Sequence, residues 1–184
     1  SKRPIIVRDQ NHKEQYKKIY GTQLPKGTTF FERKGNGNPN SYVTKFSEYL
    51  GNQSKPNITL KGSTSNNLGG QLGNGADISQ DLYNILTKLD KTLSKPKYSD
   101  VTPIRISSGN DVFHQGKTLD MNSTYGNGNG KPYTTTHTRG LAIDITSRNV
   151  KVDNLVIEAL KESGFTAIIC HGGENNYHIH ANIQ

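Results

Sequence analysis

Cysteine, tryptophan and long apolar runs are scarce in this sequence. The 184 residues include one cysteine, one methionine and no tryptophan, and apolar residues make up only 30% of the chain. A single cysteine excludes an internal disulfide and any zinc site built from several thiolates, so a metal would have to be bound by histidine and carboxylate side chains. No apolar run approaches the ~18 residues of a membrane span, and the first residues lack the apolar segment of a signal peptide.

Glycine and positive charge are abundant instead. The chain has 19 glycines, and 23 Lys and Arg residues against 15 Asp and Glu give a net charge of +8. Such a surface attracts polyanions, including nucleic acid, anionic lipid and an acidic bacterial wall. Because no nucleic-acid module or interleaved basic and aromatic stripe is present, nucleic acid is not the expected partner. The length suits one domain, or one domain with an arm.

Residues 1–76 form a Gly/Asn-rich N-terminal region to which the sequence assigns no role, and we place the main domain at residues 77–184. Within the N-terminal region we expect short helices over 11–20 and 41–51 and a strand over 28–33. Its last part, residues 62–76, is rich in Gly, Asn and Ser and is typical of a linker.

The main domain has a clearer pattern of elements. Apolar residues at helical spacing predict helices over 77–93 and 152–160, and Gly164 stands where a helix often ends in a left-handed residue. The segments 101–109, 141–146, 165–170 and 177–183 are predicted strands. This order indicates an α+β fold with a mostly antiparallel sheet and flanking helices.

Histidines are concentrated in the same part of the chain. Five of the six histidines follow residue 113. His178 and His180 alternate along a predicted strand, so both side chains project from one face while Ile179 points to the core. A half-exposed strand with polar residues outward would give the same pattern. The histidines, in chain order, are His12, His114, His137, His171, His178 and His180.

A carboxylate in an apolar setting accompanies them. Asp144 stands within LAIDIT, where an acid is costly unless it is paired or bound to a metal. His137 precedes it by seven residues, a spacing that would put the two side chains on opposite faces of a straight strand. Gly140 lies between them and permits a turn, so we expect His137 to approach from a loop.

Two imidazoles and a carboxylate match a catalytic zinc site, in which three protein ligands leave a position for water. A nearby carboxylate must then take a proton from that water. Glu174, in the Gly-rich turn HGGENNY before the two histidines, is the candidate, although a glutamate in such a turn is ordinarily only solvated. Cys170 is expected to be a buried strand residue rather than a ligand.

Taken together, these motifs resemble the superfamily that joins the D-alanyl-D-alanine zinc peptidases of bacterial walls with the Hedgehog signalling domain. The pattern H-x-x-G-x-A-x-D covers residues 137–144, with Thr135 where many members have Ser, and E-x-x-x-H-x-H covers 174–180. The segment 105–111 is similar to the strand that enters this site, and the resemblance extends over residues 101–184. It implies one zinc ion per chain held by His137, Asp144 and His180, with Glu174 as general base and His178 as a transition-state or supporting partner.

One departure concerns the electrophilic group. Many wall peptidases of this superfamily have S-G-Y-R-S before the first ligand, whereas this chain has Ser, Gly, Asn, Asp and Val at 108–112. Polarisation of the scissile carbonyl would then fall to the metal with His178, or to His114 or Arg139.

The resemblance implies a hydrolase, a zinc metallopeptidase that cuts peptidoglycan stem peptides. That activity is typical of cell-wall-degrading enzymes, including bacteriophage endolysins, and places the protein outside the cell, at the wall or on a virion. The alternatives are a non-catalytic zinc-stabilised binding or virion structural module, since Hedgehog domains use the same ligands for binding, and another kind of zinc hydrolase. The choice between carboxypeptidase and endopeptidase action stays open, as does the oligomeric state.

Overall fold

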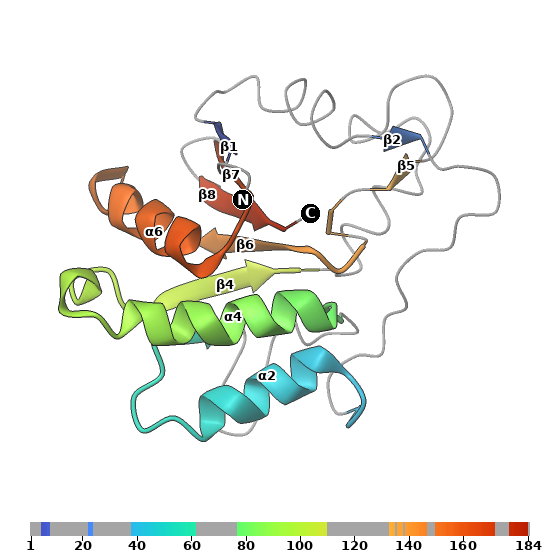
Figure 1. Ribbon diagram of the computed structural model, residues 1–184, viewed down its shortest axis with the longest axis horizontal. Coiled ribbons are helices and arrows are strands. Elements are labelled where there is room, and N and C mark those ends of the chain that lie inside the picture. Colours follow the sequence, from blue (N-terminus) through green and yellow to red (C-terminus); the bar gives the residue numbers. More distant parts are fainter. Residues whose placement is uncertain are drawn as a thin grey trace.

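The computed structural model describes residues 5–7, 22–23, 38–61, 77–109, 133–134, 136–137, 139–146, 150–171 and 177–183 (Figure 1). The helix expected over 11–20, the strand expected over 28–33 and the linker expected over 62–76 lie outside these residues.

A mixed six-stranded sheet forms the centre of the protein. The four central strands pair antiparallel, and the strand at each edge pairs parallel with its neighbour. A separate antiparallel pair joins β2 (Thr22–Gln23) and β5 (Tyr133–Thr134). The order across the large sheet is β1 (Ile5–Val7), β7 (Ala167–His171), β8 (His178–Asn182), β6 (Ala142–Thr146), β4 (Ile104–Ser108) and β3 (Ile58–Leu60).

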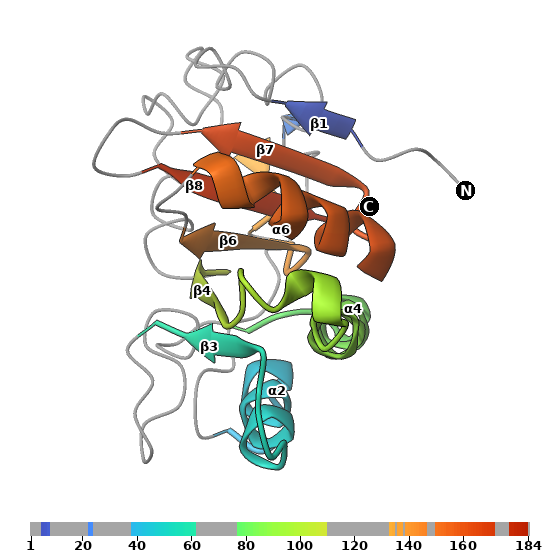
Figure 2. The ribbon, with the colours of Figure 1, turned by 90° about the vertical axis from the view of Figure 1, so that its left-hand side faces the viewer.

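Three α-helices of the described residues pack with this sheet, which confirms the α+β class (Figure 2). They are α2 (Tyr42–Gly51), α4 (Gln80–Leu93) and α6 (Val150–Ser163), and α4 contacts both of the others. A short 3-10 helix, η1 (Pro96–Tyr98), follows α4. The helices predicted at 41–51, 77–93 and 152–160 and the four predicted strands are all confirmed, with ends displaced by up to three residues.

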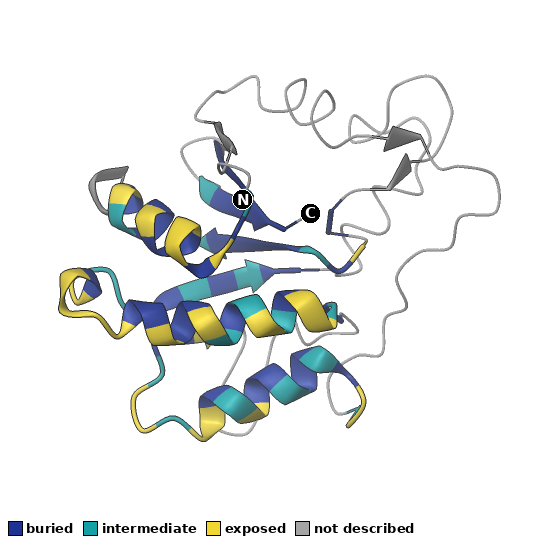
Figure 3. Cartoon of the chain, viewed as in Figure 1, coloured by how far each residue is buried: buried dark blue, intermediate teal, exposed yellow. Residues whose placement is uncertain are grey.

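Helix α4 follows from its sequence. Ser79 caps the helix, since its hydroxyl accepts a hydrogen bond from Leu82 N at 3.1 Å. Most of the apolar stripe is buried in the core, with Ile85 partly buried, and the opposite side of the helix is exposed (Figure 3). Four leucines of the stripe are at most 1% exposed: Leu82, Leu86, Leu89 and Leu93.

Residues on both sides of position 77 share one core. Val43 and Phe46 of α2 and Ile58 of β3 are buried in the same apolar cluster as the residues of α4 and the central strands. Asp77 connects the two parts, because its Oδ1 accepts hydrogen bonds from Tyr42 N at 2.9 Å and Ile78 N at 2.8 Å. The N-terminal region therefore contributes at least α2 and β3 to the body of the main domain.

The two faces of the sheet differ in chemistry. Along β6 and β8 the residues that face the helices are Ile143, Ile145, Ile179 and Ala181, all at most 1% exposed. The opposite face carries Asp144, His178 and His180, as the alternation of a strand requires. The expected placement of Ile179 in the core is confirmed. A polar site thus lies on the side of the sheet that does not contact the helices.

Candidate metal centre

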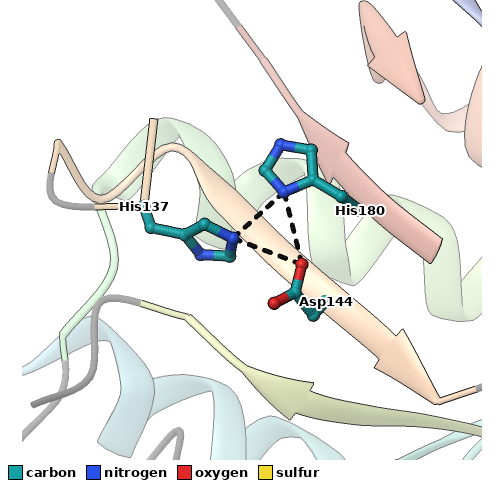
Figure 4. Close-up of side chains that lie close together, drawn as sticks. All are labelled: His137, Asp144 and His180. Carbon is teal, nitrogen blue, oxygen red and sulfur yellow. Dashed lines mark hydrogen bonds and ion pairs between the residues drawn. The ribbon is translucent and has the colours of Figure 1, made fainter. Parts of the chain in front are cut away.

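Three predicted ligands converge on the polar face of the sheet (Figure 4). His180 Nδ1 lies 3.0 Å from His137 Nε2 and 3.3 Å from Asp144 Oδ1, and His137 Nε2 lies 3.2 Å from the same oxygen. The three side chains are buried, with residue exposures of 4% for His137, 7% for Asp144 and 2% for His180. The predicted convergence of these three side chains from separate parts of the sequence is confirmed.

Strand register places two of the candidate ligands together. In the antiparallel pairing of β6 with β8, Asp144 stands directly opposite His180, and Thr146 opposite His178. Directly opposed residues in an antiparallel pair have Cβ atoms about 4.5–5.5 Å apart, so the carboxylate and the imidazole meet without distortion of the backbone. A shift of one residue would move Asp144 into the core.

A turn brings the third ligand. Gly140 has φ of 70°, and its amide donates to the His137 carbonyl at 3.0 Å, so the chain reverses between the histidine and strand β6. A positive φ is the conformation that glycine adopts without steric cost. The predicted role of Gly140 is therefore confirmed, and His137 reaches the carboxylate from outside the strand.

A β-bulge supplies the partner of the carboxylate. The register of β4 against β6 changes between Ile106 and Ser108, so that Ile106 pairs with Ile145 while Ser108 pairs with Asp144. Without the extra residue, Ser108 would continue the core-facing row that contains Ile106. Its hydroxyl instead donates to Asp144 Oδ2 at 2.7 Å, which leaves Oδ1 directed at the two imidazoles.

Each imidazole also has a partner on its outer nitrogen. His137 Nδ1 lies 3.0 Å from the Gly109 carbonyl, and His180 Nε2 lies 3.0 Å from Asn182 Oδ1 and 3.4 Å from Thr136 Oγ1. Metal-binding histidines usually donate their second N–H in this way, which fixes the ring orientation. Asn182 and the Gly109 carbonyl were not among the predicted site groups.

The arrangement of acceptors fits a cation. The Gly109 carbonyl can only accept, so His137 Nδ1 carries the proton, and a neutral His137 presents a lone pair at Nε2 toward Asp144 Oδ1. Two facing acceptors repel each other unless a cation lies between them. Tetrahedral zinc, with bonds of about 2.0–2.1 Å, separates its ligands by about 3.3–3.4 Å, close to the observed 3.0–3.3 Å. The group can therefore hold a metal ion.

The other predicted site residues have different positions. His178 Nε2 lies 3.9 Å from Asp144 Oδ1, and its side chain is 24% exposed, so it borders the cluster on a more open side. Cys170 is buried in the core and pairs with Ile179, which puts it on the sheet face opposite the ligands. Arg139 is exposed. The candidate base Glu174 lies outside the described residues, as do Thr135, His114 and His12.

Comparison with known proteins finds no protein-family model that matches the chain and no curated protein that matches it. The longest described helices have 14 residues, and none of the described helices has the length and apolar character to cross a membrane.

Proposed function

We propose that the chain is a zinc-dependent peptidase with a Hedgehog/D-alanyl-D-alanine-peptidase-like fold that cleaves peptidoglycan stem peptides. The observation that carries this proposal is the buried cluster of His137, Asp144 and His180, in the order and spacing of the motifs noted in the sequence. Two imidazoles and one carboxylate are the ligand set of many catalytic zinc sites, and soft thiolate ligands are absent from the cluster.

The metal and the surrounding side chains would divide the chemistry of amide hydrolysis. Zinc held there would lower the pKa of a bound water toward ~7 and polarise the scissile carbonyl. Glu174 would accept a proton from the attacking water and donate it to the leaving amine as the C–N bond breaks. In sequence it lies between β7 and β8, whose end residues His171 and His178 are paired.

His178 is proposed to assist at the more open side of the cluster. Its position on β8, two residues before His180, directs both side chains to the same face. Its Nε2 is near enough to Asp144 Oδ1 to belong to the site, yet at 3.9 Å it is the most distant of the three histidines from that oxygen. An N–H at this place would stabilise the oxyanion of the transition state in the absence of the arginine found in many wall peptidases.

The charge of the chain is consistent with an anionic wall as substrate. A net charge of +8 would increase the rate of encounter with acidic polymer, at low ionic strength above all. We accordingly propose a site of action outside the cell, at the wall or on a virion.

A non-catalytic zinc-stabilised binding module is the second candidate. The observation that favours it is the burial of the three ligands, each at most 7% exposed, because structural zinc sites are closed to solvent. Hydrolysis separates the two proposals. A binding module would hold zinc and bind wall fragments without releasing new ones.

The test is to incubate the purified protein with peptidoglycan and to identify the released fragments by mass spectrometry. Native protein should release stem-peptide fragments, and Glu174→Gln should release none while it retains one zinc per chain. The matched control is Glu48→Gln, because Glu48 is an exposed glutamate of α2 and its replacement should leave hydrolysis unchanged. Full turnover by Glu174→Gln would exclude its role as base, and no cleavage by native zinc-loaded protein would favour the binding module.

A further inference from the structure

Asn182 is a fully buried polar residue beside the metal cluster. It lies on β8 two residues after His180, on the same face of the sheet, and its exposure is 0%. Its neighbours across the two flanking strands are Ala142 and Ala167, whose small side chains leave room for the amide to lean along the strand toward the imidazole.

The side-chain amide of Asn182 has a hydrogen-bond partner for its oxygen and none among the described residues for its nitrogen. Its Oδ1 lies 3.0 Å from His180 Nε2, whereas its Nδ2 has no hydrogen-bond partner among the described residues. A buried N–H group without a partner is unfavourable for folding. Fold stability alone therefore does not account for an asparagine at this position, and the function of the side chain must lie with its oxygen.

That oxygen determines which nitrogen of His180 carries the proton. A neutral imidazole has one N–H and one lone pair. With Oδ1 as acceptor, the proton sits on Nε2, and the lone pair of Nδ1 faces His137 Nε2 at 3.0 Å and Asp144 Oδ1 at 3.3 Å. With the proton on Nδ1 instead, His180 would donate to His137 Nε2, and neither imidazole would present a free lone pair to the metal position.

We infer that Asn182 is a positioning residue of the metal centre: its side-chain oxygen holds His180 in the tautomer whose Nδ1 lone pair faces the metal position. The inference rests on the proposed zinc site and not on hydrolysis. His137 needs no such side chain, because the Gly109 carbonyl fixes its tautomer through the backbone. The tautomer of His137 is thus set by a backbone carbonyl, and that of His180 by the side chain of Asn182. Thr136 Oγ1 is a more distant neighbour of His180 Nε2, at 3.4 Å.

The test compares zinc affinity, measured by competition with a chromogenic chelator, in native protein and variants at residue 182. Asn182→Ala should bind zinc about 10–100-fold more weakly, the usual effect of removing an outer partner of a ligand. Asn182→Asp keeps an acceptor and lacks a donor, so it should bind within a few-fold of native. Cobalt(II) substitution should give native-like visible absorption bands in Asn182→Asp and altered bands in Asn182→Ala.

Two control variants separate positioning from loss of structure. Asn57→Ala removes another buried asparagine, one that bonds the Asp90 carbonyl at 3.0 Å, and should lower the melting temperature without changing zinc affinity. Thr136→Val should change zinc affinity less than Asn182→Ala. Circular dichroism verifies that each variant is folded.

Three results would overturn the inference. They are native affinity in a folded Asn182→Ala, a loss in Asn182→Asp as large as in Asn182→Ala, and a larger loss in Thr136→Val. A large loss in Asn182→Asp would mean that the amide N–H₂ of Asn182 donates to His180. Failure of native protein to bind zinc would instead reject the proposed function at its base, whereas normal zinc binding without hydrolysis would leave the inference standing.

Discussion

Zinc should stabilise the folded protein, and a single substitution should abolish that effect. The facing atoms of His137, Asp144 and His180 lie within 3.0–3.3 Å of one another, so a cation bound among them would be attracted by all three. The unfolded chain separates these residues and has no preformed site. Zinc would therefore bind the folded state selectively, and its binding free energy would add to the free energy of unfolding.

The magnitude follows from the linkage relation. Free zinc at one hundred times its dissociation constant adds about 2.7 kcal/mol to the free energy of unfolding, and at one thousand times about 4.1 kcal/mol. For a chain of 184 residues, 1 kcal/mol corresponds to about 2–4 °C in Tm. The melting temperature should accordingly rise by about 5–11 °C at the lower zinc concentration, and by roughly half as much again at the higher one.

The assay is thermal unfolding followed by circular dichroism in excess chelator and across a zinc titration. His180→Ala should melt at one temperature throughout, because two ligands remain and the site loses the residue opposite Asp144. His178→Ala should keep the zinc-dependent rise, since its nitrogen lies outside the cluster. An unchanged native Tm between chelator and zinc, or an equal rise in His180→Ala, would refute the assignment of the three ligands.

Three further predictions concern individual side chains. Ser108→Ala removes the donor at 2.7 Å from Asp144 Oδ2 and should weaken zinc binding by about 10-fold or more, measured by chelator competition; unchanged affinity would argue against this support. His178→Ala should retain one zinc per chain and slow peptide hydrolysis by about 10²-fold, whereas loss of zinc would make it a ligand. Burial and the hydrogen bond to Asp90 raise the pKa of Tyr49 to about 12. The folded state thus retains this proton above pH 10, and the stability gained is complete below pH 10 and lost as the pH rises through 12. Tyr49→Phe should lower stability by about 1 kcal/mol at pH 8 and flatten its decline above pH 10, measured by urea unfolding; an equally steep decline would contradict the assignment.

The long elements and the candidate ligands were predictable because their signals are local. Helix α4 has four turns of apolar residues at constant spacing, and β8 alternates histidine with aliphatic residues. Each pattern can therefore be recognised from the sequence of the segment alone. Asp144 stood out because an acid within an apolar strand needs a partner. The same alternation could also have placed Asn182 on the face of His180, since it follows His180 by two residues.

Other features depend on contacts that no local pattern encodes. Strands β1 and β3 have three residues each, too few to show a period, and they are strands because β7 and β4 offer parallel partners. The role of Ser108 depends on a change of register between two strands that are more than thirty residues apart in sequence. Likewise, the packing of α2 into the core depends on Asp77. Its carboxylate accepts hydrogen bonds from the backbone N–H groups of Tyr42 and Val43, in the first turn of α2.

The extra residue in β4 also sets a condition for anyone who wishes to graft this centre onto another scaffold. Copying Asp144 and His180 onto regular antiparallel strands, with His137 on a turn, would reproduce the candidate ligands. It would omit the hydroxyl that orients the acid, because the residue of the adjoining strand at the place of Ser108 would face the core. A designed copy would have to include the irregular strand β4 beside the two histidines and the aspartate. This strand is needed for its backbone path, which directs Ser108 toward Asp144.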